Sequence, residues 1–429
     1  MKLSYDKADV CTETVNLPLS KSIGARALIL AHIYGGAVML QRVPDCDDSH
    51  ELAAALEKLA VSDGQRFTYD LGSGGTSLRF FLALAASSQG FRGDIDCSDV
   101  LRSRPIAPLV DALRSAGAQI EYIKEEGRPP LRVQGRRLRG TDMVPGAAVS
   151  SQYVSALLMA SLLWNKRYEP QIAPQSVSAP YIRMTREMMR QFAELSEQAK
   201  DTGCARIYTV EADWSSASYF YEFVLAEPSA SVRLRGLLPE GESLQGDNAC
   251  AQIYSRLGVR TIYGADRTVT IEANAREIAA LSKHRTETAD GKTVRLNLRE
   301  TPDLVPSLAV GMCLVGICYE ITGIGHLRYK ESDRIAVLCS EMRKAGYLLQ
   351  PGDDSLSWSG ERCDAGPDVP VFEAHGDHRM AMALSVMAVK KGEIIIKGER
   401  CVEKSFPRFF DELHKLGFRG EGEKERQQE

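Results

Sequence analysis

Six times along this chain, a short polar or glycine-rich segment opens directly onto a run of apolar residues. The helices that this pattern predicts cover residues 27–31, 78–86, 154–163, 217–226, 304–318 and 380–389. A helix that is apolar on nearly every face belongs in the middle of a domain. The pattern therefore predicts six buried helices, each entered from a polar segment.

The polar segments that precede these helices are residues 21–26, 72–76, 150–152, 213–216, 301–303 and 376–379. The first turn of a helix carries unpaired N–H groups and about half a positive charge, so several such ends facing one cleft would bind an anion. Ser, Asp and Gly are also ordinary helix caps, and for any single opening capping remains the simpler interpretation. Six openings with basic residues nearby favour an anion site. These residues are Lys21, Arg26, Arg79, Lys330, Arg334 and Arg379.

Runs that resemble strands alternate with the helices, at residues 120–123, 131–133 and 393–397. Helices alternating with strands predict an α/β or α+β fold. The openings recur roughly every 50 to 90 residues, which indicates a degenerate repeat. A chain of 429 residues is too long for one core, so we expect two domains. Residues 201–213 are predicted to link the two halves, and the tail from Gly420 is predicted to fray.

Composition narrows the class of protein. The chain is 44% hydrophobic and 26% charged, which is ordinary for a soluble globular protein. A net charge of −4 gives no support to nucleic-acid binding. The ten cysteines contain no Cys-x-x-Cys pair and the seven histidines show no zinc-ligand spacing, so no metal site is predicted. No secretion signal or membrane span is expected, and a cytoplasmic protein is predicted.

The densest charge cluster is Lys330-Glu331-Ser332-Asp333-Arg334, which runs directly into an apolar helical pattern. A solvated helix usually spreads its charges at a spacing of three or four residues. Four charges in five positions therefore indicate a site for a charged ligand.

Other polar segments carry weaker predictions. Residues 72–76 lack the Gly-Lys-Ser/Thr ending of a Walker loop, so a turn is the better interpretation. Ser150, Ser151 and Gln152 offer more hydrogen-bonding groups than one helix cap needs, which favours a hydroxylated or phosphorylated ligand as much as a cap. In the segment 101–105, one of two arginines could hold a carboxylate or phosphate, and a solvated surface arginine is the equal alternative.

Two further segments suggest proton chemistry. His378 lies between Asp377 and Arg379 at a helix start, which favours a functional role over a structural one. Asp303 follows Pro302 near the first turn of an apolar helix, where capping explains it adequately. A role for Asp303 as a base would need a substrate hydroxyl within reach.

Together these segments resemble the 5-enolpyruvylshikimate-3-phosphate synthase family, in the family's order from about residue 17 to about residue 410. The matching segments are Leu17-Pro18-Leu19-Ser20-Lys21-Ser22 with Arg26, Gly75-Thr76 with Arg79, Arg104-Pro105, Ser150-Ser151-Gln152, Ser178-Ala179-Pro180-Tyr181, Asp213-Trp214-Ser215-Ser216-Ala217-Ser218-Tyr219, Gln245-Gly246-Asp247, Pro302-Asp303, Lys330-Glu331-Ser332-Asp333-Arg334, Asp377-His378-Arg379-Met380-Ala381 and Lys404-Ser405-Phe406-Pro407.

The resemblance implies an α/β (α+β) fold of two inside-out barrel domains. Each domain would contain three βαβαββ-type units, with parallel helices inside and sheets outside. One domain would comprise residues 1–17 and 214–429, the other residues 18–213, and the active site would lie in the cleft between them.

The resemblance also implies a reaction. The enolpyruvyl group of phosphoenolpyruvate would pass to the 5-hydroxyl of shikimate 3-phosphate with release of phosphate, by addition and elimination. This is the sixth step of the shikimate pathway to chorismate and the aromatic amino acids. Asp303 would act as the base and Glu331 as the acid with His378 nearby, while Lys21 and Lys404 would stabilise the departing phosphate.

Binding residues carry over from the family by position. Shikimate 3-phosphate would contact Lys21, Ser22, Arg26, Ser150, Ser151, Gln152, Ser178, Asp303 and Lys330. Phosphoenolpyruvate would contact Lys21, Gly75, Arg104, Gln152, Arg334, Arg379 and Lys404. The family implies a monomer that acts on these two small molecules without cofactor, metal, nucleic acid or membrane, and that glyphosate inhibits.

Several positions depart from the family pattern. Leu19 replaces a common glycine, Ala25 replaces a common asparagine, and Ser73-Gly74 replaces a common Asn-Ala. These positions flank the ligand residues, so they put substrate affinity in question more than activity. Residues 191–210 match the family poorly and are predicted to be a local variation.

Two other functions remain as alternatives. The related enolpyruvyl transferase that acts on UDP-N-acetylglucosamine has asparagine after the early lysine and uses a loop cysteine as acid. Here Ser22 follows Lys21, and the residues around Cys97 do not match. The other alternative is a non-catalytic binding protein of the same fold.

Overall fold

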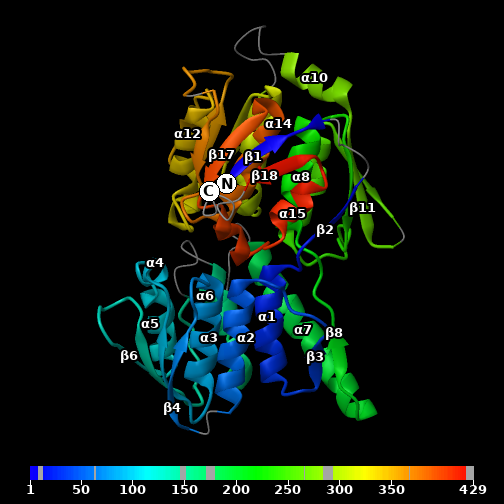
Figure 1. Cartoon of the computed structure of the whole chain (residues 1–429). Helices are drawn as coiled ribbons and strands as arrows, with labels where there is room; N and C mark the ends of the chain where they lie inside the picture. The colour runs from blue at the N-terminus through cyan, green and yellow to red at the C-terminus, as the bar shows by residue number, and fades with distance from the viewer. Residues whose placement is uncertain are drawn as a thin grey trace. The chain divides into compact units, whose positions relative to one another are not determined.

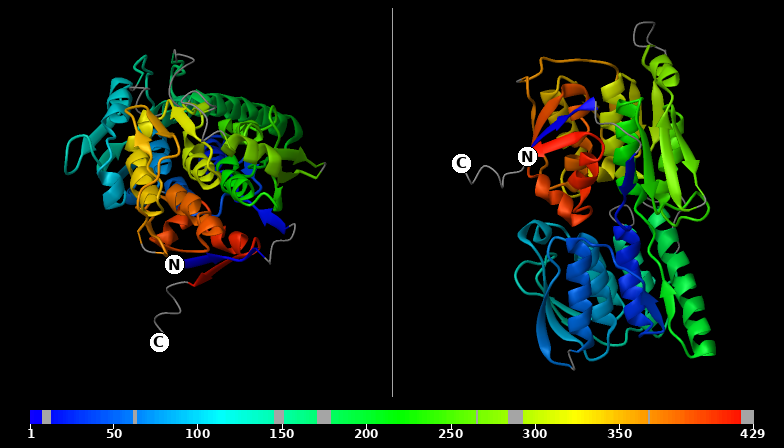
Figure 2. Two further views of the ribbon diagram at one scale, coloured as in Figure 1. Left: turned by 90° about the horizontal axis from the view of Figure 1, so that it is seen from above. Right: turned by 45° about the vertical axis from the view of Figure 1, so that its right-hand side comes forward.

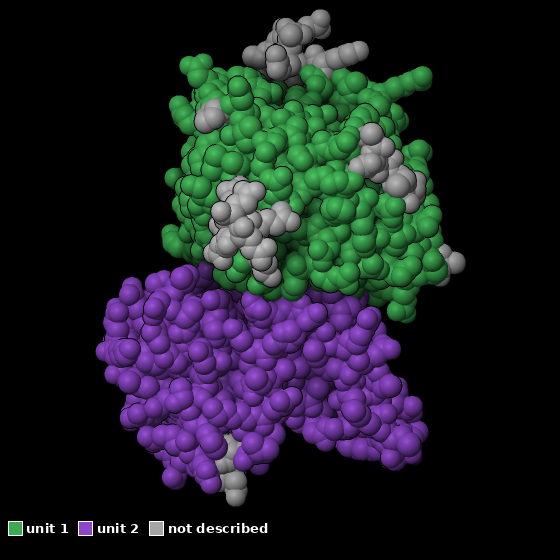
Figure 3. Space-filling model, viewed as in Figure 1, with its two compact units in different colours: residues 1–18, 212–429 green, residues 19–211 purple. Residues whose placement is uncertain are grey.

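The computed structural model describes residues 1–7, 13–61, 64–144, 151–170, 179–264, 266–283, 293–366 and 368–421. The chain divides into two compact units (Figure 3), which we call unit 1 (Met1–Pro18 and Ala212–Glu429) and unit 2 (Leu19–Glu211). In the part of the chain described, no helix is both long and apolar enough to cross a membrane.

The described residues of unit 1 form three four-stranded sheets and the helices that pack between them. Its strands are β1 (Lys2–Tyr5), β2 (Glu13–Asn16), β9 (Ser231–Arg235), β10 (Val259–Tyr263), β11 (Thr268–Ala273), β12 (Val294–Asn297), β13 (Tyr319–Thr322), β14 (Gln350–Pro351), β15 (Ser355–Trp358), β16 (Val371–Glu373), β17 (Glu393–Lys397) and β18 (Phe418–Glu421). Its α-helices are α8 (Trp214–Ala226), α9 (Cys250–Ser255), α10 (Ala275–Lys283), α11 (Val305–Val315), α12 (Arg334–Lys344), α13 (His378–Ser385), α14 (Ala388–Lys391) and α15 (Phe409–His414).

Unit 2 is built in the same way from fewer strands. Its strands are β3 (Val38–Leu40), β4 (Arg66–Asp70), β5 (Arg92–Asp96), β6 (Gln119–Tyr122), β7 (Leu131–Gln134) and β8 (Arg206–Tyr208). Its α-helices are α1 (Lys21–Ile33), α2 (Asp47–Ala60), α3 (Gly75–Ser87), α4 (Asp99–Arg102), α5 (Ala107–Ser115), α6 (Ser151–Ala160) and α7 (Ala179–Thr202).

One strand order recurs in four sheets, which is the repeat that the spacing of the helix openings predicts. The orders are β12-β13-β15-β14, β4-β5-β7-β6, β2-β9-β11-β10 and β16-β17-β1-β18. In each sheet the first two strands are parallel and the other pairs are antiparallel. In the last sheet, β1 from the N-terminal end of the chain pairs with β17 and β18 near the C-terminal end (Figures 1 and 2).

The central helices explain the apolar runs in the sequence. In unit 1, α8, α11 and α13 pack against one another, and every residue of α8 is buried. In unit 2, α3 packs against α6 and α1, and α3 is buried except at its first two residues. A helix surrounded by other elements has no solvent face, so it needs apolar or small side chains all round. The mixed α/β architecture is confirmed.

The predicted helix 154–163 is α-helical only to Ala160 and ends in a 3-10 turn, Ser161–Leu163. Two other predicted helices are too long. The run 304–318 forms a helix only as far as Val315, because Gly316 adopts a left-handed conformation with φ of 75° and ends it. The run 380–389 is divided between α13 and α14, since Val386 and Met387 lie in a turn. Apolar character continues past both breaks, so it could not reveal where the backbone changes direction.

Two predictions about chain segments are also wrong in part. The proposed linker 201–213 contains the end of α7 and strand β8, which pairs in parallel with β3. The tail predicted to fray from Gly420 contributes Gly420 and Glu421 to β18, where they pair with Leu3 and Lys2. Polar residues can form edge strands when a partner strand supplies the hydrogen bonds, and sequence does not show the partner.

Candidate active site

Side chains cap some of the helices that begin at polar segments, and others have no such cap. Asp213 Oδ2 accepts a hydrogen bond from the Ser216 N–H at the start of α8 (2.9 Å), and Asp377 Oδ1 accepts one from the Arg379 N–H at the start of α13 (3.0 Å). Helices α1 and α3 follow Ser20 and Gly74, and neither helix has a side-chain cap. Capping therefore accounts for the polar residues before α8 and α13, and it does not account for those before α1 and α3.

In unit 1, Asp303 lies at the centre of a cluster of cations. Its Oδ1 accepts a hydrogen bond from Arg334 Nη1 (2.9 Å), and its Oδ2 accepts one from Arg379 Nη2 (2.9 Å). Lys330 Nζ lies 3.9 Å from Oδ1. Asp303 is 8% exposed. Three basic residues from two separate segments, 330–334 and 376–379, thus surround one buried carboxylate.

Arg334 connects this carboxylate to two others. Its Nε donates to Asp377 Oδ2 (2.8 Å) and its Nη2 donates to Glu331 Oε2 (2.7 Å), in addition to the bond with Asp303. Burial alone would lower the pKa of the guanidinium, but Asp377, Glu331 and Asp303 together raise it above the ordinary value. Arg334 is 1% exposed, so the dense charge cluster in the sequence is folded inward onto its neighbours.

The start of α13 supplies the next part of the site. Asp377 is fully buried and also accepts a hydrogen bond from Ser332 Oγ (3.1 Å). His378 is buried beside it, and Lys404 Nζ donates to the Gly376 carbonyl (3.1 Å). His378 therefore begins α13, and Lys404 is bonded to the loop before it, at the helix start whose Asp377 is bonded to Arg334.

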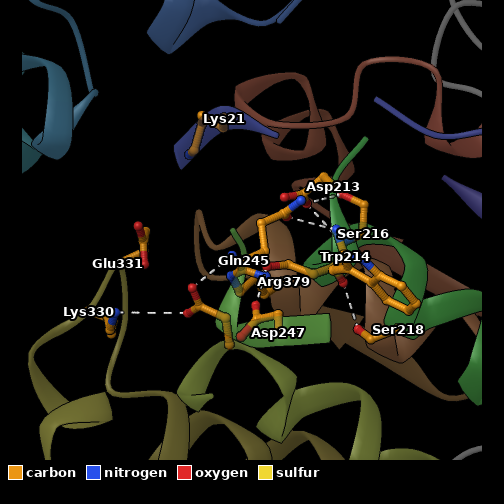
Figure 4. A network of polar contacts seen from close by, with 12 residues as sticks. Lys21, Asp213, Trp214, Ser216, Ser218, Gln245, Asp247, Lys330, Glu331 and Arg379 are labelled. Atoms are coloured by element: carbon orange, nitrogen blue, oxygen red, sulfur yellow. Dashed lines mark hydrogen bonds and ion pairs between the residues drawn. The ribbon is translucent and has the colours of Figure 1, made fainter. Parts of the chain in front are cut away.

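A frame of polar contacts holds the start of α8 in place (Figure 4). Gln245 Oε1 accepts a hydrogen bond from the Trp214 N–H (2.9 Å), and Gln245 Nε2 donates to the Ala212 carbonyl (2.7 Å). Asp247 accepts a hydrogen bond from Ser215 Oγ. The Gln-Gly-Asp segment that carries part of the family resemblance is therefore the partner of the segment 212–216.

Asp247 is a buried acid that the site prediction did not include. Burial, reinforced by the negative charge of Asp303, raises its pKa from 3.8 to about 7, while Arg379 acts in the opposite direction. A carboxyl with this pKa changes charge near neutral pH. The sequence offered the Gln-Gly-Asp match as a signal, but the burial that shifts the pKa is visible only in the fold.

His326 is a second polar residue that the prediction missed. It lies in a 3-10 turn, Gly325–Tyr329, before Lys330. Burial, followed by the charge of Lys330, lowers its pKa to about 4. His326 is therefore a neutral hydrogen-bonding group near Lys330 at physiological pH. In the sequence, the only sign of a role for His326 is its position four residues before Lys330.

In unit 2, Lys21 is the first residue of α1 and forms an ion pair with Asp48 Oδ2 (3.0 Å). The lysine side chain is 24% exposed and that of Asp48 is 10% exposed. Lys21 therefore keeps access to solvent and to a ligand, while Asp48 offsets its charge from the side of the helix.

Arg26 lies one turn further along α1 and is almost completely buried. Its Nε donates to Thr185 Oγ1 (2.7 Å), its Nη1 to the Ser22 carbonyl (2.8 Å) and its Nη2 to Ser155 Oγ (3.1 Å). Burial lowers its pKa to about 10. Arg26 joins α1 to α6 and α7 through neutral acceptors and holds the backbone of Ser22.

Gly75 opens α3 beside a group of hydrogen-bonding side chains. Gln152 Nε2 donates to Thr76 Oγ1 (2.9 Å), and Gln152 Oε1 accepts from Arg79 Nη1 (2.9 Å). A Cβ atom on Gly75 would lie 2.8 Å from Arg79 Nη1 and 3.5 Å from Arg104 Nη1. The absence of a side chain therefore lets Arg79 and Arg104 lie close to the Gly75 backbone, where Arg79 Nη1 donates to the Gly75 carbonyl (2.8 Å).

The two arginines of the segment 101–105 have different surroundings. Arg102 forms ion pairs with Asp96 (2.6 Å) and Asp99 (2.6 Å), which gives it a structural role on the surface. Within the described residues, no carboxylate lies within ion-pair distance of Arg104. Arg104 is half-buried and is the arginine that remains for a ligand.

The other predicted residues of unit 2 lie at helix starts or outside the described residues. Ser22 lies in the first turn of α1, and Ser151 is the buried first residue of α6. Ser150 and Ser178 fall outside the described residues. Among the described residues, no group of three or more His, Cys, Asp or Glu side chains is arranged to hold a metal ion.

Comparison with known proteins identifies the same family as the sequence motifs do, over nearly the whole chain. A family model described as EPSP synthase (3-phosphoshikimate 1-carboxyvinyltransferase) matches residues 6–413. A 3-phosphoshikimate 1-carboxyvinyltransferase of Bacteroides fragilis is 36% identical over 414 residues, which cover 94% of this chain and 95% of the relative. A protein of the same description from Pseudoalteromonas atlantica is 32% identical, over 94% of this chain and 96% of the relative. Another from Vibrio cholerae is 30% identical, over 96% of this chain and 99% of the relative.

Solved structures support the fold. An EPSP synthase structure from Acinetobacter baumannii matches with a TM-score of 0.67 at 21% identity, covering 97% of this chain and 99% of that chain. A second structure of an EPSP synthase from Acinetobacter baumannii gives a TM-score of 0.65 at 19% identity, with 98% and 100% covered.

Proposed function

The chain belongs to the EPSP synthase (3-phosphoshikimate 1-carboxyvinyltransferase) family, and from this premise we propose that it transfers the enolpyruvyl group of phosphoenolpyruvate to the 5-hydroxyl of shikimate 3-phosphate. Phosphate is the second product. The reaction is the sixth step of the shikimate pathway, which leads through chorismate to the aromatic amino acids.

The observation that carries the proposal is the cluster around Asp303. A carboxylate, a second carboxylate at Glu331 and three cations are held together by bonds of 2.7 to 2.9 Å and one ion pair of 3.9 Å. Both substrates carry several negative charges, which the arginines and Lys330 can bind in bidentate or point-charge fashion. The carboxylates supply the groups that proton transfer requires.

The proposal assigns residues from both units to each substrate. Both units would therefore have to contact the same two bound molecules. Shikimate 3-phosphate would be held by Lys21, Ser22, Arg26, Ser150, Ser151, Gln152, Ser178, Asp303 and Lys330. Phosphoenolpyruvate would be held by Lys21, Gly75, Arg104, Gln152, Arg334, Arg379 and Lys404. Arg26 would act mainly by positioning Ser22, since its donors already bond to protein oxygens.

In the first step, Asp303 removes the proton from the 5-hydroxyl and the oxygen attacks C2 of phosphoenolpyruvate. Glu331, with His378 nearby, delivers a proton to the methylene carbon, which becomes a methyl group. A tetrahedral adduct results, with its phosphate still attached. In the second step the C–O bond to phosphate breaks, the methyl group loses a proton to a carboxylate, and the double bond re-forms. Lys21 and Lys404 stabilise the departing phosphate.

Ligand binding would also change the partners of Asp303. When the phosphate and carboxylate groups of the substrates arrive, Arg334, Arg379 and Lys330 gain new anionic partners. Their bonds to Asp303 would then be shared with the substrates, which frees carboxylate oxygens to contact the 5-hydroxyl.

Phosphate release tests the proposal with two acceptors. The enzyme is mixed with phosphoenolpyruvate and either shikimate 3-phosphate or UDP-N-acetylglucosamine, and phosphate is measured over time. Release with shikimate 3-phosphate alone is the expected result. Release with UDP-N-acetylglucosamine would favour the related transferase, and no release with either acceptor would favour a non-catalytic binding protein.

The surroundings of Cys97 argue against the related transferase. That reaction needs a cysteine that can give up a proton, whereas Cys97 is buried and its burial raises its pKa to about 12. We also propose that the enzyme works as a cytoplasmic monomer on small molecules, without metal or nucleic acid. A single species near 47 kDa on size-exclusion chromatography with light scattering is expected.

A further inference from the structure

The outer face of one sheet in unit 2 carries a hollow lined largely by arginine. The sheet is β4-β5-β7-β6, and the hollow has a volume of about 590 Å³. In Figure 1, its edge strands β4 and β6 lie in the lower left part of the picture. The polar residues that line the hollow are Arg66, Arg92, Arg114, Arg132, Gln119, Gln134 and Glu121. The whole chain has a net charge of −4, whereas the side chains that line the hollow are mainly positively charged.

Strand register places two of these arginines side by side. Arg66 on β4 lies opposite Arg92 on β5, and Arg92 lies opposite Gln134 on β7, which lies opposite Gln119 on β6. Side chains at these positions face outward, because the alternate residues of each strand are buried against the helices. Like charges directly opposite one another on neighbouring strands destabilise a sheet. This row contains two such charges and no carboxylate.

The neighbouring arginines differ because the protein itself occupies their donors. Arg132 donates through Nε and Nη2 to the two oxygens of Asp94, at 2.9 Å each. Arg114 donates through Nε (3.1 Å) and Nη2 (2.7 Å) to the Ile120 carbonyl. Within the described residues, the side chains of Arg66 and Arg92 form no hydrogen bond or ion pair. Two guanidinium groups without a bonded partner among the described residues therefore lie next to two that are fixed in place, and Asp94 and Glu121 are the acidic groups nearby.

We propose that this hollow binds a compact anion that carries two or more phosphate groups, with Arg66 and Arg92 as its principal ligands. The planar fork of arginine matches phosphate oxygens in bidentate fashion. Gln119 and Gln134 extend the row with amide groups that can donate to further oxygens. A volume of about 590 Å³ lies in the usual range for small-molecule sites. No aromatic ring is present among the described lining residues, so stacking on a nucleobase is not part of the proposal.

The hollow is separate from the residues assigned to the reaction. Arg66 begins β4, and the strand then runs to Asp70 before the turn that leads to Gly75. At about 3.3 Å per residue, the strand alone places its two ends about 13 Å apart. The proposal therefore does not depend on the proposed function, and its test needs neither substrate.

Calorimetric titration with inorganic pyrophosphate at low ionic strength tests the site. The wild type is compared with the double variant Arg66→Gln/Arg92→Gln. Loss of one charged hydrogen-bonding group costs about tenfold in affinity, so the double variant is expected to bind about 100-fold more weakly at this site. Its kcat and its KM for phosphoenolpyruvate should stay at the wild-type values.

A matched control removes the same charge elsewhere. Arg233→Gln/Arg260→Gln replaces two exposed arginines on the β9 and β10 strands and should bind pyrophosphate as the wild type does. Gln134→Glu, which sets a carboxylate beside Arg92, should weaken binding without removing an arginine. Equal weakening in the control pair would mean that only net charge matters. Unchanged binding in either hollow variant would overturn the site.

Discussion

Unit 1 and unit 2 each contribute predicted site residues, but the chemistry around these residues differs. Around Asp303 in unit 1, carboxylates and cations are bonded directly to one another. Around Gly75 in unit 2, the groups are an uncapped helix start, the neutral amide of Gln152 and the guanidinium groups of Arg79 and Arg104.

The difference separates two tasks. Carboxylates beside cations can accept and deliver protons, and their proton affinity changes when the cations find other partners. An uncapped helix start with a neutral amide can hold an anion, but it offers no group that exchanges protons near neutral pH. Substitutions of the carboxylates Asp303 and Glu331 in unit 1 should therefore affect mainly turnover, and those around Gly75 should affect mainly which ligand binds.

The largest effect is expected for Asp303→Ala. Loss of a general base lowers kcat by about 10²- to 10⁴-fold, whereas the KM for shikimate 3-phosphate should change little. Steady-state kinetics with both substrates varied would measure the two effects separately. Asp353→Ala, which removes an exposed carboxylate elsewhere in unit 1, should behave as the wild type. If Asp303→Ala kept its turnover and lost only affinity, Asp303 would be a binding residue.

A different kind of effect is expected for Gly75→Ala. The new Cβ would lie 2.8 Å from Arg79 Nη1, so the guanidinium must move. A ligand bound beside Gly75 would then have less space. One methyl group in a pocket changes discrimination by about 10- to 200-fold, and we expect glyphosate to inhibit the variant more weakly by such a factor. Inhibition curves at fixed phosphoenolpyruvate would measure this.

The control for this change is Gly366→Ala, whose new Cβ would make only an ordinary contact of 3.7 Å. It should leave glyphosate inhibition as in the wild type. Undiminished inhibition of Gly75→Ala would show that the inhibitor does not bind beside Gly75.

The smallest effect concerns stability and comes from Asp247. Its pKa is raised in the folded protein from 3.8 to about 7, so the stability that its neutral form contributes is complete below about pH 4 and is lost as pH rises through about 7. Asp247→Asn cannot ionise and can still accept the bond from Ser215. The variant should match the wild-type Tm near pH 4 and exceed it at pH 8. A Tm difference that does not change with pH would contradict the shifted pKa.

The central helices could be predicted from the sequence because their environment determines every face. All 13 residues of α8 are buried, and its sequence is apolar, aromatic or small except at Glu222, whose pKa is raised by burial. The ends of α11 and α13 could not be predicted in the same way. A left-handed Gly316 and a turn at Val386 depend on backbone geometry that hydrophobicity does not encode.

The site was predictable as a set of residue types and not as a set of contacts. The density of charge in Lys330–Arg334 indicated a ligand site, but the sequence could not show that Arg334 would be bonded to Asp377 and Asp303. Asp247 and His326 were missed for a related reason. Their pKa values depend on burial and on charges contributed by distant segments.

Running the reaction in D₂O tests the central claim most directly, because proton delivery to the methylene carbon is the step assigned to unit 1. Mass spectrometry of the product should show deuterium at that carbon for the wild type, and also for Gly75→Ala at whatever rate it turns over. Glu331→Gln should lose turnover and deuterium incorporation together. Product that forms at the wild-type rate without deuterium would contradict addition–elimination, and with it the role given to the Asp303 and Glu331 cluster.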